Sequence, residues 1–117
     1  MAGLAVALGA FGAHGLKKIV SPENVATYQT GVQYQMYHAM ALIIVGILSE
    51  RIASHYLSYA GVLFVAGIVL FSGSLYLIVS LYAMNKAVPT AVGILTPIGG
   101  LFFILGWISL LLSLLKK

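Results

Sequence analysis

Long apolar runs that lack strand alternation constrain this chain more than any other feature. They cover about residues 2–16, 33–49, 56–84 and 90–115 of a 117-residue sequence. A helix needs about 20 residues to cross the roughly 30 Å of hydrocarbon in a bilayer. Lipid admits only helices and closed barrels, because each backbone polar group must be paired inside the protein. The sequence therefore predicts an all-α integral membrane protein, a four-helix bundle in which residues 1–117 form a single transmembrane domain.

Composition agrees with a membrane location. Hydrophobic residues make up 62% of the chain and charged residues only 7%, and the mean hydropathy is +1.08, whereas soluble domains are about a quarter charged. The net charge of +4 comes from cations scattered singly or in pairs, which suits lipid headgroups better than a nucleic-acid backbone. The absence of cysteine excludes disulfides, thiolate metal ligands and cysteine nucleophiles. We expect membrane lipids as partners and no nucleic acid.

Local signals mark where the helices begin. Ser21, Pro22 and Glu23 are typical of a helix start, because serine caps the free amides, proline fits the first turn and an acid favours the positive helix end. The next turns are polar, which predicts a short polar helical extension before the second span. Ser54 is expected to cap the third span, and Pro89 precedes the fourth. The first run is short for a span, and no Lys or Arg precedes it, which argues against a cleaved leader.

Charge does not fix the orientation. Four spans would put both termini on one side of the membrane, and the flanking cations then divide three against three: Arg51, Lys116 and Lys117 against Lys17, Lys18 and Lys86. The excess of Lys and Arg that normally sets orientation is therefore missing. Paired lysines at a helix end are a dense signal on either side, and we expect the termini and the Arg51 loop in the cytoplasm.

The densest polar group in the chain contains two histidines. His14 lies near the end of the first span, and Gln33, Tyr34, Gln35 and His38 lie near the start of the second. An antiparallel hairpin is expected to bring both histidines to one face at comparable depth, and ionisable residues inside membrane segments suggest a functional site. A hydrogen-bonded structural cluster, a site for a small ligand or quinone head, and a metal or haem site all stay open. Two histidines without a carboxylate make a poor zinc site, and we expect no resident cofactor.

Pro97 lies inside the fourth span. It removes one backbone donor and leaves the carbonyl of Gly93 without its usual partner. We expect a kink, beside which this carbonyl and the Thr96 hydroxyl form a small polar pocket. Packing alone is the alternative explanation for the kink.

A second polar group, Ser72, Ser74 and Tyr76, interrupts the middle of the third span. A serine hydroxyl can bond the carbonyl one turn earlier, so these residues do not require a ligand. Neither an acid nor a second base accompanies them, which argues against a serine nucleophile. The tyrosines near segment ends are typical of an interfacial belt: Tyr28, Tyr56, Tyr59 and Tyr82. Trp107 lies deeper and is expected to serve packing.

Glycines are the most numerous small residues in the spans. They are Gly9, Gly12 and Gly15 in the first, Gly61, Gly67 and Gly73 in the third, and Gly93, Gly99, Gly100 and Gly106 in the fourth. In lipid, small residues let helix backbones approach closely. They predict packing within the chain or, alternatively, a seam between copies of it.

Four segments occur in a specific order: GAFGAHGL (residues 9–16), TGVQYQMYHA (30–39), LFSGSLY (70–76) and TPIGG (96–100). Together they resemble the YwdK-like family of small bacterial membrane proteins over essentially the whole chain. The resemblance implies a four-span protein of the bacterial inner membrane and brings no established activity, substrate or cofactor. It also implies several more apolar residues before Gly9, so we expect this chain to start inside the first span.

Two classes of function compete. We expect a non-enzymatic protein that acts by association, as a homo-oligomer or as an accessory subunit of a larger membrane complex, because packing glycines abound and no catalytic constellation is apparent. The alternatives are a small transporter or channel, or a binder of a lipid or quinone-like ligand at the His14 and His38 cluster. Proton-coupled export needs an acid within the bilayer, whereas Glu23 and Glu50 fall at helix ends or loops. A leak or anion pathway needs no acid, and the charge tie would suit an antiparallel dimer.

Overall fold

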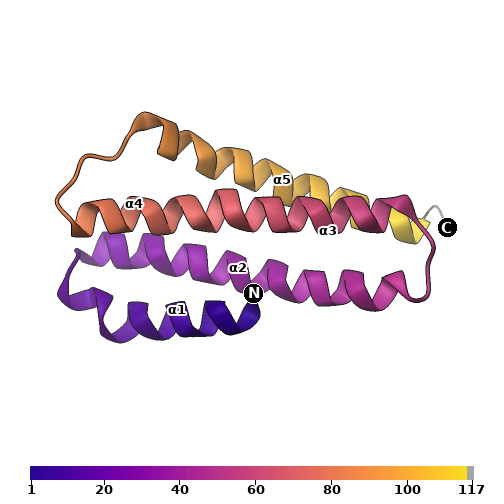
Figure 1. Ribbon diagram of the computed structural model, residues 1–117, viewed down its shortest axis with the longest axis horizontal. Coiled ribbons are helices and arrows are strands. Elements are labelled where there is room, and N and C mark those ends of the chain that lie inside the picture. The colour runs from indigo at the N-terminus through magenta and orange to yellow at the C-terminus, as the bar shows by residue number, and fades with distance from the viewer. Residues whose placement is uncertain (116–117) are drawn as a thin grey trace.

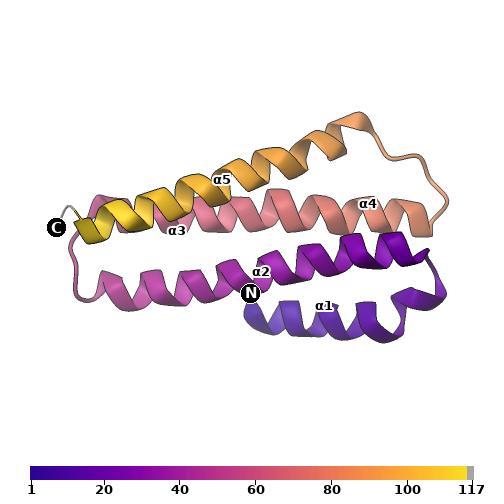
Figure 2. The same ribbon diagram turned by 180° about the vertical axis from the view of Figure 1, so that it is seen from behind.

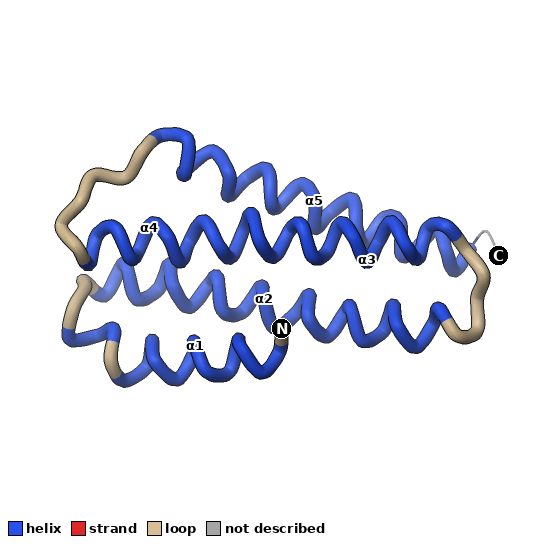
Figure 3. Tube along the Cα trace, viewed as in Figure 1, coloured by secondary structure: helices blue, strands red, loops and turns tan. Residues whose placement is uncertain are grey.

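The computed structural model describes residues 1–115 and confirms the all-α prediction, because all regular structure in these residues is helical. The elements are α1 (Ala2–His14), the short 3-10 helix η1 (Leu16–Lys18), α2 (Pro22–Ser49), α3 (His55–Gly67), the π-helical segment η2 (Ile68–Ser72), α4 (Gly73–Ala83) and α5 (Thr90–Leu115). α3, η2 and α4 follow one another without a break and form one continuous rod (Figure 3).

Three rods among the described residues are long and apolar enough to cross a membrane: Pro22–Ser49, His55–Ala83 and Thr90–Leu115. The helix α1 has 13 residues and rises about 20 Å, which is less than the hydrocarbon thickness of about 30 Å. The expected first span, residues 2–16, is therefore shorter than predicted, because the α-helix ends at His14. Membrane-spanning capacity is shown for three of the four predicted spans.

The predicted second span, residues 33–49, is continuous with the polar turns before it. The polar extension and the span are one helix of 28 residues that starts at Pro22. The hydroxyls of Thr27 and Thr30 donate to carbonyls one turn earlier, at Glu23 and Ala26, so the polar turns stay helical. The predicted extension is thus confirmed, but no boundary separates it from the span.

The predicted helix starts are confirmed by their capping bonds. Ser21 Oγ accepts a hydrogen bond from the backbone N–H of Asn24 at 3.3 Å, and Ser54 Oγ accepts one from Tyr56 N–H at 3.2 Å. At the other end of the third rod, Asn85 has φ of 57°, a left-handed conformation that asparagine tolerates better than most residues. These residues fix where the rods begin and turn.

The rods lie in a flattened row (Figures 1 and 2). The principal extents of the Cα trace are 50 × 28 × 14 Å, so the arrangement is closer to one layer than to a square four-helix bundle. α1 lies along the N-terminal half of α2, and Met1 therefore sits midway along the molecule (Figure 1). α5 packs on α3 and η2 and diverges from α4 towards the loop at residues 84–89.

Two separate apolar cores follow from this arrangement. The larger one joins the second half of α2 to α3, η2 and α5: Ala41, Val45, Leu57, Ala60, Phe64, Ile68, Phe103 and Leu110. The smaller one joins η1 to the first half of α2 and to α4 through Leu16, Tyr28 and Val79, and Leu8 of α1 packs against it. The polar residues of the candidate site lie between these two cores.

Candidate functional site

His38 is buried, and both of its ring nitrogens are occupied. Nδ1 lies 2.7 Å from the carbonyl oxygen of Tyr34, and Nε2 lies 3.0 Å from Nε1 of Trp107. An indole nitrogen can only donate, so Nε2 accepts and the proton resides on Nδ1, which donates to the Tyr34 carbonyl. The imidazole is thus a neutral bridge between α2 and α5.

Aromatic rings surround this bridge. The ring of Phe103 stacks on His38 with centroids 3.6 Å apart and planes 12° from parallel, and Trp107 meets His38 edge-on. Phe103 and Trp107 are four residues apart on α5, as Tyr34 and His38 are on α2, so each pair shares one helix face. The expected packing role of Trp107 is therefore accompanied by a hydrogen bond, which sequence spacing could not indicate across 69 positions.

A groove of about 620 Å³ runs beside the aromatic cluster. It is lined by Tyr34, His38, Phe71, Pro97, Gly100, Leu101, Phe103, Ile104 and Trp107. The lining is almost entirely aromatic and aliphatic. Because Tyr34 and Trp107 occupy both imidazole nitrogens, the groove offers a ligand no free nitrogen of His38.

A second polar chain links three helices. Tyr76 on α4 donates its hydroxyl proton to Gln35 Oε1 on α2 at 2.7 Å, and Gln35 Nε2 donates to the carbonyl oxygen of Met1 at 2.9 Å. Gln35 is only 2% exposed. A buried amide must find partners for its oxygen and its nitrogen, and this one finds them on two different elements.

The two serines at the middle of the third rod also bond across helices. Ser72 Oγ donates to the carbonyl oxygen of Gly31 on α2 at 2.7 Å. Ser74 Oγ bonds the carbonyl of Phe71, as expected from its position, and also the hydroxyl of Thr96 on α5. Ser72, Ser74 and Tyr76 therefore connect the third rod to both of its neighbours.

The structure does not bring His14 to His38. α1 and α2 are antiparallel in a register that places the Met1 carbonyl against Gln35 and the Leu8 carbonyl 2.7 Å from the hydroxyl of Tyr28. His14 lies beyond Leu8 towards the loop and is exposed, whereas His38 lies ten residues past Tyr28, about 15 Å further along α2 in the opposite direction. The expectation that the hairpin brings both histidines to comparable depth is wrong.

The remaining residues of the predicted cluster do not form one site either. Gln35 and His38 are buried but belong to two different hydrogen-bond chains, and Gln33 is exposed. Tyr34 contributes its carbonyl and stacks its ring on Phe71. Tyr28, expected at the interface, is instead buried against Leu8, a contact that depends on the register of α1 and that no local pattern could reveal.

Gly93, Thr96 and Pro97, the residues of the predicted polar pocket, face different surroundings. α5 continues as a helix from Thr90 to Leu115, and Thr96 is turned to Ser74. Gly93 is exposed, with no neighbouring atom near its face, because α5 has diverged from α4 at that level. Pro97 is exposed and borders the aromatic groove instead.

Several glycines are sites of close helix contact within the chain. A Cβ at Gly99 would overlap the backbone nitrogen of Phe71, and one at Gly106 would come within 2.7 Å of the Phe64 ring. A Cβ at Gly12 would likewise collide with the ring of Tyr28, and one at Gly31 with the ring of Tyr76. The packing interpretation holds for these positions. A Cβ would meet nothing within 4 Å at Gly3, Gly46, Gly73 and Gly93.

Comparison with known proteins supports the membrane assignment. Residues 8–100 match the family described as "Protein of unknown function (DUF423)". The chain is 42% identical over 113 residues to a UPF0382 membrane protein of Staphylococcus aureus, covering 97% of this chain and 87% of the relative. It is also 42% identical over 114 residues to the UPF0382 membrane protein YwdK of Bacillus subtilis, covering 97% and 88%. No solved structure matches the chain.

Proposed function

The chain belongs to the DUF423 family of membrane proteins, whose function is unknown, and we propose that it acts by association within the membrane. In this proposal it is a homo-oligomer or an accessory subunit of a larger membrane complex, and it is not an enzyme. It would reside in the bacterial inner membrane as a four-helix, multi-pass protein with cytoplasmic termini.

The observation that carries the proposal is that the buried polar side chains find their hydrogen-bond partners within the protein. No buried side-chain nitrogen or oxygen within the described part of the chain lacks a hydrogen-bond partner. The buried polar residues are Gln35, His38, Ser72, Ser74 and Ser113. Catalysis or selective transport needs polar groups that are free to meet a substrate. Here Gln35, His38, Ser72 and Ser74 bond across helices, and Ser113 bonds the Leu110 carbonyl of its own helix. This is expected of a protein whose role depends on its shape.

The ionisable residues support the same conclusion. Glu23 lies in the first turn of α2 and Glu50 follows its last turn, and both are exposed at opposite ends of that helix. Residues 1–115 contain no group of three His, Cys, Asp or Glu side chains that could hold a metal ion. A proton-coupled transporter would need an acid at membrane depth.

The outer surface is suited to helix contact. Large apolar residues are exposed along α2 and α5: Ile43, Ile44, Ile47, Ile104, Ile108 and Leu111. Gly46 on α2 and Gly93 on α5 have open space in front of them, and small residues let a neighbouring helix approach closely in lipid. Both features are compatible with lipid contact and favour association when a partner is present.

Cross-linking in native membranes tests the association. The chain lacks cysteine, so single cysteines at Gly46 and at Gly93 can be oxidised to disulfides without background. We expect a discrete covalent dimer or a defined cross-linked partner, together with a matching mass in detergent. A strictly monomeric mass with no cross-linked product from either position would contradict the proposal.

The proposed topology has its own test. Ala53 and Asn85 lie in loops at opposite ends of the rods (Figure 1), so single cysteines there should differ in their reaction with a membrane-impermeant maleimide. We expect Asn85→Cys to react from outside intact cells and Ala53→Cys to react only after lysis. The reverse pattern would overturn the proposed orientation, and equal labelling of both would indicate insertion in two orientations.

A further inference from the structure

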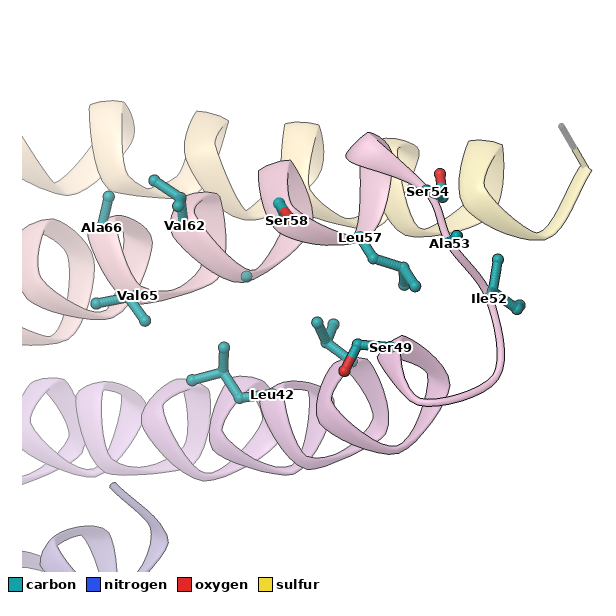
Figure 4. A pocket seen from close by; sticks show the side chains of 12 residues that line it. Leu42, Ser49, Ile52, Ala53, Ser54, Leu57, Ser58, Val62, Val65 and Ala66 are labelled. Carbon is teal, nitrogen blue, oxygen red and sulfur yellow. The ribbon is translucent and has the colours of Figure 1, made fainter. Parts of the chain in front are cut away.

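A groove of about 830 Å³ opens between the second half of α2 and α3 (Figure 4). Its walls include Leu42 on α2 and Val62 and Val65 on α3. Val45 and Leu57 form part of the lining yet stay buried, at 9% and 2% exposed. The groove is therefore a slot whose floor is the contact between α2 and α3.

The polar atoms of this groove gather at one end. Ser49, Ser54 and Ser58 lie towards the loop that joins α2 to α3, whereas Leu42, Val65 and Ala66 line the end further from the loop (Figure 4). The Ser49 hydroxyl donates to the carbonyl of Gly46, and Ser54 Oγ accepts from Tyr56 N–H. An amphiphile with an apolar chain and a polar head fits this order in one direction only.

A second hollow, of about 590 Å³, adjoins the polar end. It shares Ala53 and Ser54 with the groove and adds His55, Tyr56 and Tyr59 at the beginning of α3. The positive end of a helix attracts phosphate groups, and the exposed cation of Arg51 lies in the same loop, with the exposed carboxylate of Glu50 beside it. Tyrosine hydroxyls at this level can donate to phosphate oxygens.

We propose that these two hollows form a binding site for one phospholipid with an anionic headgroup. One acyl chain lies in the slot between α2 and α3, and the phosphate lies at the start of α3 within reach of Arg51, Tyr56 and Tyr59. The inference rests on the membrane location of the chain and does not depend on the association proposed above. Such a lipid would be retained in preference to the lipids around the rest of the protein.

The dimensions of the slot favour an acyl chain over a second protein helix. At the floor of the slot α2 and α3 are in contact, since a Cβ added to Gly61 would lie 3.7 Å from the Val45 side chain, whereas a helix with its side chains is about 10–12 Å wide. An acyl chain is one carbon wide and can follow the exposed face of Val62 without displacing the buried residues. A second helix could lie over the slot but could not reach its floor without separating α2 from α3.

Native mass spectrometry of the full chain in detergent, with added phosphatidylglycerol or phosphatidylcholine of matched chain length, tests the site. We expect one phosphatidylglycerol to survive activation that strips other lipids. Val62→Trp should fill the slot and reduce retention to the level of the stripped lipids. Val62 is 68% exposed, so the larger side chain does not enter the core. Leu77→Trp, at an exposed position on α4 outside the groove, is the matched control and should retain the lipid.

The headgroup contribution has a separate control pair. Arg51→Gln should weaken phosphatidylglycerol retention about fivefold, the usual size of one cation near an anionic lipid, and should leave phosphatidylcholine unchanged. Lys86→Gln, in the loop at the opposite end, should change neither. Phosphatidylglycerol with a photoreactive acyl chain should cross-link mainly to residues 42–66.

Three results would overturn the proposal. Equal retention by all four variants would show that lipids adhere around the whole apolar surface. Cross-links spread evenly over the rods would show the same thing without relying on any variant. A lipid-free dimer that Val62→Trp disrupts would assign the groove to a second copy of the chain.

Discussion

The seams that hold α1 and α5 to the rest of the molecule are built in different ways. α1 is attached by side chains that reach its backbone, since Tyr28 donates to the Leu8 carbonyl and Gln35 to the Met1 carbonyl. α5 is held by close packing at glycines: Gly99 lies directly against the backbone of Phe71, and Gly106 lies against the Phe64 ring. Both seams contain hydrogen bonds and glycine contacts, since Gly12 lies against the Tyr28 ring and Thr96 bonds Ser74. Of the two, only the α5 seam places a glycine, Gly99, against the backbone of another element.

This contrast determines which amino-acid substitutions each of the two helix interfaces tolerates. In lipid, apolar burial contributes little to helix association, so hydrogen bonds and close packing must provide it. A lost hydrogen bond between membrane helices costs on the order of 1 kcal/mol, and a long side chain can find another partner. A backbone contact leaves no side chain to move, so the α5 seam should be the less tolerant of the two.

The largest effect is expected from Gly99→Ala. The added Cβ would overlap the backbone nitrogen of Phe71 and lie 2.8 Å from its Cα, so η2 and α5 must separate, at a cost of about 3 kcal/mol. Gly93→Ala on the same helix meets nothing within 4 Å and should leave stability unchanged. Equilibrium unfolding in mixed micelles measures both variants. Equal stability of the two would show that α5 is not held by shape.

A smaller loss, about 2 kcal/mol, is expected for His38→Ala, which removes the stack on Phe103 and leaves the Trp107 N–H without its acceptor. The fluorescence of Trp107, the only tryptophan, should shift as its environment changes. His14→Ala, at an exposed position, should change neither stability nor fluorescence. If His38→Ala kept full stability and instead lost a co-purified quinone-like molecule, the ligand interpretation of His38 would replace the structural one.

Gln35→Leu probes the polar seam, with an expected cost of about 1–2 kcal/mol because the Tyr76 hydroxyl loses its acceptor and the Met1 carbonyl keeps only the helical bond from Ala5 N–H. Tyr76→Phe alone should cost about 1 kcal/mol, and the double variant should cost less than the sum, because the two changes remove the same bond. A double-mutant cycle on thermal unfolding measures this coupling. Additive losses would mean that the two side chains are independent, and Gln33→Leu, at the exposed neighbour, serves as the control.

The smallest effect is expected for Ser72→Ala, about 0.6 kcal/mol, the average for one hydrogen bond between membrane helices. The hydroxyl donates to the Gly31 carbonyl, which belongs to α2 and keeps its own helical partner. Ser58→Ala, on the exposed side of α3, should show no change in the same unfolding assay. A loss as large as that of Gly99→Ala would erase the proposed difference between polar and steric contacts.

Local signals in the sequence predict the helices well. The caps at Ser21 and Ser54 depend on residues within three positions of each other, and Thr90 and Leu115 bound the fourth rod as predicted. The length of the first span is overestimated, because apolar composition continues through Leu16 while the α-helix ends at His14. Composition reports which residues tolerate lipid and says less about where a helix stops.

The site is harder to predict, because its contacts depend on helix register. The sequence pattern correctly indicates polar groups in membrane segments at Gln35, His38, Ser72, Ser74 and Tyr76, but their partners lie 22 to 69 positions away. The false pairing of His14 with His38 assumes that the hairpin aligns residues near the Lys17 and Lys18 end. The observed register is instead set by the fit of Gly12 to Tyr28 and by the bond from Gln35 to Met1.

The π-helical segment η2 limits how the length of the third rod can vary. Phe64, Ile68 and Ser72 are all buried, and two turns between the first and the last take eight residues, where a regular α-helix would take about 7.2. The wide turn, in which Gly73 N–H bonds the carbonyl of Ile68, therefore resets the angular phase of everything after it. Loss of one residue within 68–72 would let the rod close into a regular α-helix, because seven residues at about 100° each make roughly 700°, within about 20° of two full turns. A deletion here would therefore shorten the rod and leave the faces of α4 nearly in place, whereas one in the regular turns of α3 or α4 would rotate everything after it by about 100°.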